Sequence, residues 1–406
     1  MVLTTSVRHG RWPEMALTLH QARLLTPTGV SNAASIVVSD EGHVALAGAG
    51  PRASTVDGPC IDLDGRLVAP GFVDLHVHGG FGIQFGRLGS IAEDLRTYSQ
   101  QVVTKGVTGF LCTVAAPDAP TLARVVQEYA DVLDGDLPGA EALGLHLEGP
   151  FLNPAKRGAF DGAWIRKPDI QEVETLLAAG RGWIRVVTIA PELPGARELA
   201  ARLRRAGVVV ALGHSDADYA MASAALSGDW THVSHAFNAQ RGFHHREPGA
   251  LGAVLTSQRV TAEVIADGVH VHPAAIRVLL RCLGSDRVVL TTDAMAGAGL
   301  SDGQYELLGR TVTVRNGQAR LPDGTLAGST VTLNQCVRNL VDQIGVPLHQ
   351  AVTMASRNPA RVLGLNRLGG IGVGHEASLT VIDDNAQVYM TCVRGRIVHR
   401  ASPGAG

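Results

Sequence analysis

Eight short runs of apolar and β-branched residues, separated by amphipathic stretches, lie between residues 71 and 293 and constrain the fold more than any other feature. The expected strands cover residues 72–78, 108–113, 142–148, 184–190, 208–214, 231–235, 261–266 and 287–293, and helices such as 91–104, 120–133, 171–179 and 196–206 fill the gaps. This alternation is typical of repeated βα units and a parallel sheet. Eight such units close a barrel, so the sequence predicts an α/β fold with a (β/α)8 TIM barrel.

The segments on either side of the barrel have a different pattern. Strands are expected within residues 17–64, 311–321, 379–383 and 393–399, and helices near 330–344 and 348–355. The dipeptide Asn316-Gly317 is favoured in hairpin turns. We expect the two flanks to pair as one small β-sandwich domain. The expected division is 1–68 and 361–406 for this domain, 69–305 for the barrel, and 306–360 for a hairpin and helices that complete the barrel and the rim of the active site. Residues 1–14 and 401–406 are expected to be loosely ordered.

The composition is that of a globular enzyme. The 406 residues exceed the ~250 of a typical barrel, and a net charge of −2 excludes polyanion binding as the main role. The sequence has no apolar run of the ~18 residues that a membrane span needs and no N-terminal signal core, so a cytoplasmic location is expected. Five widely separated cysteines predict neither disulfides nor a thiolate zinc site.

A pair of histidines lies at the end of the first expected strand, in the sequence Pro-Gly-Phe-Val-Asp-Leu-His-Val-His-Gly-Gly. Side chains alternate along a strand, so His76 and His78 share one face. At the carboxyl end of a barrel strand they point into the mouth, where barrel enzymes keep their active sites. Imidazole suits zinc or iron. One His-x-His pair is a weak signal by itself, and the other strand ends strengthen it.

Three further strand ends carry groups that bind metals. Glu148 ends the third expected strand, His214 the fifth and His235 the sixth. A glutamate inside an apolar run is costly unless it is paired or bound to metal. His146 and His232 lie upstream of their strand ends, and a structural role is favoured for both.

Asp293 ends the eighth expected strand, where a general base could reach a water activated by a metal. A helix N-cap is the alternative role for this aspartate, but that role leaves the other metal-compatible strand ends unexplained. The three lysines, Lys105, Lys156 and Lys167, do not end barrel strands. A lysine-derived bridging ligand is therefore excluded, and Glu148 is the candidate bridge between two ions.

These residues resemble the amidohydrolase superfamily and, more narrowly, the N-acetylglucosamine-6-phosphate deacetylases. The motifs that carry the resemblance run in order from about residue 68 to 328: Pro70-Gly71-Phe72 to His78-Gly79-Gly80, Gly144-Leu145-His146-Leu147-Glu148-Gly149-Pro150-Phe151, Leu212-Gly213-His214-Ser215, His235-Ala236-Phe237-Asn238-Ala239, His245-Arg246-Glu247-Pro248-Gly249, Ala266-Asp267-Gly268-Val269-His270, and Asp293. As an ordered set they are a strong signal.

The resemblance implies a role for each matching residue. Glu148, His214 and His235 would hold the main divalent ion, and His76 and His78 a second. Zinc is expected, with Fe, Mn, Co or Cd as alternatives. Asp293 would be the catalytic acid and base, and His270 would polarise the acetyl carbonyl. The implied substrate contacts are Ala159, Phe160, Asn238, Ala239, Arg246, Asp267, His270, Leu326, Ala327 and Gly328.

The implied reaction is hydrolysis of the acetamide of N-acetylglucosamine 6-phosphate, with Arg246 gripping the phosphate. A homodimer is also implied, in which the Arg246 loop could serve the neighbouring subunit. Neither nucleic acid nor a membrane is an expected partner. Two alternatives stay open: another amidohydrolase, such as a cyclic amidase or a deaminase, and a catalytically silent barrel used as a scaffold.

Overall fold

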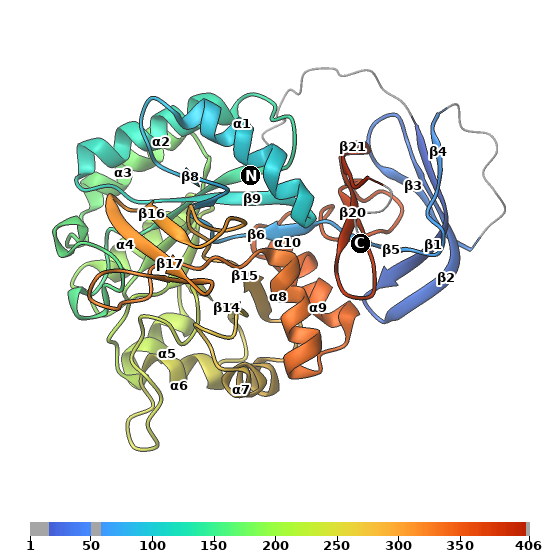
Figure 1. Cartoon of the computed structure of the whole chain (residues 1–406). Coiled ribbons are helices and arrows are strands. Elements are labelled where there is room, and N and C mark those ends of the chain that lie inside the picture. The colour runs from blue at the N-terminus through green and yellow to red at the C-terminus, as the bar shows by residue number, and fades with distance from the viewer. Residues whose placement is uncertain (1–15, 50–57, 403–406) are drawn as a thin grey trace.

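The computed structural model describes residues 16–49 and 58–402. It has a (β/α)8 barrel and a flanking β domain, which lie side by side in Figure 1. Within the described residues, no helix is both long and apolar enough to cross a membrane. The expected looseness of residues 1–14 and 403–406 concerns residues outside the described part.

The barrel sheet confirms the predicted βα repeat. Its eight parallel strands are neighbours in the sheet in chain order: β6 (Phe72–Asp74), β9 (Val107–Val114), β10 (Glu141–Glu148), β11 (Ile184–Ile189), β12 (Val209–Leu212), β13 (Trp230–Val233), β14 (Thr261–Ile265) and β15 (Val288–Thr291). Backbone hydrogen bonds just beyond β6 and β15 join the first strand to the last, since the amide of Asp293 donates to the carbonyl of His76 and that of His78 to Ala294.

Amphipathic helices pack on the outside of the barrel. They are α1 (Ile91–Val102), α2 (Ala119–Leu133), α3 (Ile170–Gly180), α4 (Ala196–Arg205), α5 (Tyr219–Ser227), α6 (Gly249–Thr256), α7 (Pro273–Leu283), α8 (Leu333–Asn339), α9 (Leu348–Ala355) and α10 (Arg357–Val362). Helix α2 shows why the sequence starts a helix where it does. The Asp118 side chain accepts from the amide of Thr121, a proline occupies the first turn, and an apolar face including Leu122, Val126 and Tyr129 is buried.

The two flanks pair in the β domain, as predicted. Hydrogen bonds join its strands in one sheet in the order β21 (Arg396–Arg400), β20 (Val388–Val393), β19 (Leu379–Ile382), β5 (Leu67–Pro70), β1 (Leu17–Thr26), β2 (Gly29–Val38) and β3 (Val44–Ala49), with β4 (Cys60–Asp62) on β1. The antiparallel ladder between β5 and β19 links the beginning of the chain to its end. The flanking β domain therefore encloses a second core of its own.

A small antiparallel sheet follows the barrel strands and covers part of the mouth (Figure 1). Its strands are β16 (Gly303–Leu307), β17 (Arg310–Arg315) and β18 (Gln318–Arg320). The turn between β17 and β18 is the predicted Asn316-Gly317 pair, and both residues have positive φ, 51° and 70°. This is the backbone that a type I′ hairpin turn requires.

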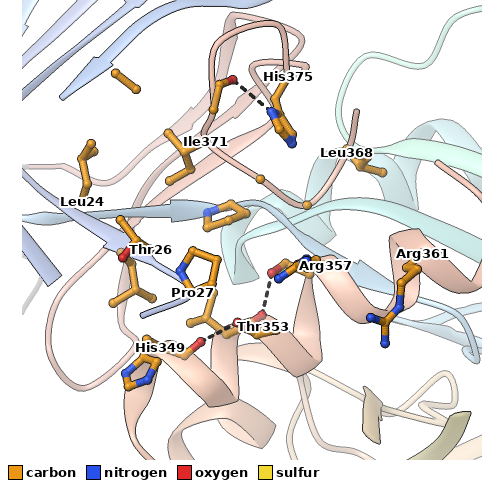
Figure 2. Close-up of a pocket in the computed structure, with 18 of the residues that line it drawn as sticks. Leu24, Thr26, Pro27, His349, Thr353, Arg357, Arg361, Leu368, Ile371 and His375 are labelled. Atoms are coloured by element: carbon orange, nitrogen blue, oxygen red, sulfur yellow. Dashed lines mark hydrogen bonds between the residues drawn. The ribbon is translucent and has the colours of Figure 1, made fainter. Parts of the chain in front are cut away.

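A cavity of about 590 Å³ lies between the β domain and the helices α9 and α10. Figure 2 shows Pro27 of the β1–β2 turn facing Thr353 of α9, with Arg357 and Arg361 on α10 nearby. Among the described residues its lining contains no carboxylate, and its two histidines, His349 and His375, lie well apart in Figure 2. Metal sites of the predicted kind are built from carboxylates or converging imidazoles, so the metal chemistry that the sequence predicts belongs to a different cavity.

Candidate active site

Except for Glu148, the predicted metal donors lie just beyond the barrel strands, whereas the sequence pattern predicts them on the strands themselves. Strand β12 ends at Leu212, β13 at Val233 and β15 at Thr291. The next residues turn sharply: His214, His235 and Asp293 have φ values of 47°, 27° and 48°. Side chains other than glycine rarely adopt this left-handed conformation, and such strain is concentrated at functional sites. The turns aim the three side chains into the barrel mouth.

Glu148, at the end of β10, is the centre of the site. One of its oxygens, Oε1, lies 3.1 Å from His214 Nε2 and 2.9 Å from His235 Nε2. The two Nε2 atoms are 3.1 Å apart. Bonds of 2.0–2.1 Å to one ion place neighbouring donors roughly 3 Å apart. These three atoms are therefore spaced as the ligands of a single ion.

Two further donors, His76 and His78, lie between Glu148 and Asp293. His78 Nε2 lies 3.0 Å from Glu148 Oε2 and 3.3 Å from Asp293 Oδ1. His76 Nε2 lies 3.2 Å from Glu148 Oε1 and 3.6 Å from Asp293 Oδ1. His78 therefore faces one oxygen of Glu148, whereas His76 shares the other with His214 and His235, so Glu148 and His76 stand between the two groups of donors.

The hydrogen bonds on the far side of two rings set their tautomers. His214 Nδ1 lies 2.7 Å from the carbonyl oxygen of Lys156, and His76 Nδ1 lies 2.9 Å from Glu263 Oε2. Both partners only accept hydrogen bonds, so each Nδ1 carries the hydrogen and each Nε2 of a neutral ring offers its lone pair to the site. His76 Nε2 is buried without a hydrogen-bond partner, which suits a metal ligand.

A cavity of about 390 Å³ opens above these donors. Six residues predicted to contact substrate line it: Ala159, Phe160, Asn238, Ala239, Leu326 and Gly328. Gly328, at φ 65°, lets its loop approach closely, because a Cβ there would lie 3.0 Å from the carbonyl oxygen of Asp293. His270 also lines the cavity, and its Nδ1 is 2.6 Å from Asp267 Oδ2.

Three of the residues predicted to contact substrate do not line this cavity, and neither does the predicted metal ligand His76. Asp267 acts on it only through His270, and Ala327 is fully buried beside it. Arg246 is exposed, and its Nη1 pairs with His245 Nε2 at 2.8 Å. The predicted phosphate anchor therefore does not face the pocket of its own chain.

Comparison with known proteins identifies the family. A model of the amidohydrolase family matches residues 67–398. The chain belongs to the amidohydrolase family. One relative, the N-acetylglucosamine-6-phosphate deacetylase of Vibrio furnissii, is 41% identical over 82% of this chain and 83% of its own length. Another, the N-acetylgalactosamine-6-phosphate deacetylase of Escherichia coli O157:H7, is 37% identical over 82% of this chain and 88% of its own length.

A solved structure has the same fold over nearly the whole amidohydrolase chain. It is a variant of the N-acetyl-D-glucosamine-6-phosphate deacetylase of Mycobacterium smegmatis in complex with N-acetyl-D-glucosamine-6-phosphate. The sequence identity is 36%, the TM-score is 0.86, and the match covers 95% of this chain and 100% of that chain.

The amidohydrolase family is metal-dependent, and the electrostatics of this site fit a cation. Burial alone opposes ionisation of Glu148, but the nearby imidazoles, His76 first, hold its pKa well below the usual range. Burial lowers the pKa of His78, but Asp293 and Glu148 raise it to about 9. Positive charge beside the buried carboxylates stabilises their ionised form. Imidazole and carboxylate donors together suit a divalent transition metal.

Two charged residues at the site, Glu263 and Arg320, were not predicted from the sequence, and neither were Gly158, Leu307, Leu308 and Thr325 in the cavity lining. Glu263, fully buried in β14, pairs with His76 and His232. It could have been found by the same signal as Glu148, an acid inside an apolar strand. Arg320, on β18, lines the cavity, and no local pattern marks it because the hairpin is placed over the mouth by tertiary packing.

Proposed function

We propose that this chain hydrolyses the acetamide of N-acetyl-D-glucosamine 6-phosphate to acetate and glucosamine 6-phosphate. The observation that carries the proposal is the convergence of Glu148, His214, His235 and Asp293 below a cavity in a chain whose relatives bear that activity in their names. An inert scaffold has no use for such a set of buried, mutually facing donors.

Glu148, His214 and His235 would hold the main ion, and His76 and His78 would hold a weaker second ion, with Glu148 between the two. Zinc suits these ligands best, and Fe, Mn, Co or Cd would also fit. When bound, the metal supplies Lewis acidity, which lowers the pKa of water toward neutrality and polarises a carbonyl.

Asp293 is placed to move the proton. Its side chain is 14% exposed, and its Oδ1 faces the donor cluster at the floor of the cavity. Burial opposes ionisation, yet His76 and His78 lower the pKa of Asp293, so the carboxylate is ready to accept a proton from the attacking water. The same carboxyl would then protonate the leaving amine.

His270 would stabilise the negative charge that develops on the acetyl oxygen. Asp267 binds its Nδ1 and orients the ring at the edge of the cavity, and a protonated ring would donate its Nε2 hydrogen to that oxygen. Loss of one such donor typically costs about 3 kcal/mol in the barrier. Ala159, Phe160, Leu326 and Gly328 would enclose the sugar.

The phosphate subsite leads us to propose a homodimer. The loop that precedes α6 and carries Arg246 protrudes from the barrel (Figure 1), and Arg246 does not line its own pocket. In a dimer this loop would bring Arg246 to the pocket of the second copy, where a guanidinium can grip phosphate oxygens in a bidentate manner. Asn238 and Ala239 of that second copy, which line its pocket, would contact the same phosphate.

The test is an assay of acetate release with and without a chelator. The substrates are N-acetylglucosamine 6-phosphate, its unphosphorylated counterpart and N-acetylgalactosamine 6-phosphate, because one relative is named for the galactose epimer. We expect chelator-sensitive turnover that is fastest on the glucose epimer with its phosphate. Faster turnover of the galactose epimer would reassign the substrate, and the absence of chelator-sensitive turnover on either phosphate would refute the deacetylase proposal. The cytoplasmic location stays a prediction.

A further inference from the structure

The interior of the barrel just beneath the metal donors is polar. The interiors of TIM barrels are usually filled by branched apolar side chains. Here the following side chains are at most 2% exposed: Asp74, Thr113, His146, Thr188, His232, Ser234, Glu263 and Thr291. Burying polar groups is costly unless each has hydrogen-bond partners. A polar layer at this depth therefore indicates a functional role.

Glu263, in this layer, touches two segments that carry the proposed metal ligands. Its Oε2 lies 2.9 Å from His76 Nδ1 and 3.1 Å from the backbone nitrogen of His235. Its Oε1 lies 3.0 Å from His232 Nε2. One carboxylate thus ties the segment after β6 to the turn after β13.

These contacts determine where the ring hydrogens lie. An ionised carboxylate only accepts, so His76 Nδ1, His232 Nε2 and the His235 amide all donate to Glu263. His232 Nδ1 then accepts from the hydroxyl of Thr261, 2.7 Å away. His76 is left with its Nε2 lone pair directed at Glu148 and Asp293.

We propose that Glu263 is a positioning residue that fixes the tautomer and orientation of His76, strengthens its Nε2 as a donor through the carboxylate charge, and thereby sets the affinity of the site for its second ion. The inference rests on the proposed function, because it takes the site to hold metal. Carboxylates that bind the outer nitrogen of a ligand histidine typically change metal affinity by about 10- to 100-fold. Glu263 needs no contact with substrate for this role.

A purely structural role is the competing explanation. A buried ion pair is poor evidence of stability, because well-packed apolar residues of similar volume often serve as well. The arrangement of Glu263 favours positioning, because the oxygen that binds His76 is shared with the amide of His235 and so holds both donor segments in one geometry.

The test compares Glu263→Gln with the wild-type protein. The glutamine oxygen can still accept from His76 and the His235 amide. Its amide group can donate to His232 Nε2 once that ring moves its hydrogen to Nδ1, beside the Thr261 hydroxyl. The variant therefore keeps its packing and the tautomer of His76 but loses the negative charge that makes His76 Nε2 a stronger donor to metal. We expect the second zinc ion to bind about 10- to 100-fold more weakly, measured as zinc per subunit over a series of chelator-buffered zinc concentrations.

Thr188→Val is the matched control. Thr188 belongs to the same buried layer, and its side chain hydrogen-bonds His146 and Ser234 at 2.8 Å, neither of which is a proposed ligand. Thermal unfolding of the zinc-free proteins should show comparable losses for the two variants, while only Glu263→Gln weakens zinc binding. The role of Glu263 is overturned if its variant keeps second-ion affinity within threefold of wild type, or if Thr188→Val weakens it equally. Absence of stoichiometric zinc on the wild-type protein would instead overturn the proposed function.

Discussion

Replacing Asp293 by asparagine separates the proton-transfer step from binding of the main ion, although Asp293 also lies beside the proposed ligands of the second ion, His76 and His78. The backbone of Asp293 is anchored at both ends, since its amide donates to the His76 carbonyl and its own carbonyl accepts from the amide of Ser329. An asparagine has nearly the same shape and keeps both anchors. The proposed ligands of the main ion, Glu148, His214 and His235, are untouched, so we expect fold and main ion to be retained.

The expected loss follows from the chemistry of the missing carboxylate. The amide side chain of the Asp293→Asn variant cannot accept the proton of the attacking water or return it to the leaving amine. Assistance of this kind is worth about 10² to 10⁴ in rate, or about 2.7 to 5.4 kcal/mol in the barrier. The Asp293 Oδ1 contacts with His78 and His76, at 3.3 and 3.6 Å, are long, so we expect a smaller effect on stability than on turnover.

Steady-state acetate release and zinc content, measured on the same preparation, provide the assay. Asp384→Asn is the control, because Asp384 is 70% exposed and pairs with Arg23 in the β domain, far from the cavity. That variant should match wild type in both measurements. Turnover of Asp293→Asn within a few fold of wild type, with normal zinc content, would refute the assignment of Asp293 as the base.

Three further outcomes are expected. Changing His76 to Gln and His78 to Asn together should remove the second ion and leave reduced activity; loss of both ions would show that the pair belongs to the primary site. Arg246→Ala should lower kcat/KM for the phosphorylated sugar by about 10- to 150-fold, from the roughly 1.5 to 3 kcal/mol of a hydrogen bond to a charged group, and equal losses on the unphosphorylated sugar would contradict phosphate binding. Burial and the nearby Glu376 raise the pKa of Glu141 from 4.5 to about 8, although Arg394, which pairs with both carboxylates, opposes the shift, so the folded protein binds a proton that the unfolded chain releases, and stability falls as pH rises through this window. Glu141→Gln should lack that loss, and parallel melting curves of variant and wild type between pH 5 and 8.5 would argue against it.

The sequence by itself determines the barrel and most of the donor cluster. Period-2 and helical patterns are local, so eight βα units and the Asn316-Gly317 turn are visible without a structure. Parallel strands of a barrel bring their carboxyl ends to one rim. Residues that end different strands, such as His78 and Glu148, must therefore meet there, and the structure places them 3.0 Å apart.

Only the tertiary structure decides how those donors are aimed and what lies around them. The left-handed turns at His214, His235 and Asp293 come from packing across the barrel mouth, whereas strand propensity alone extends the strands through these residues. Tertiary packing also decides which positive side chains lie at the cavity. The hairpin that carries Arg320 places it in the cavity lining, whereas Arg246 lies outside the lining. Contacts between residues far apart in the chain, such as Glu263 with His76, depend on strand register and closure, which no local pattern of residues contains.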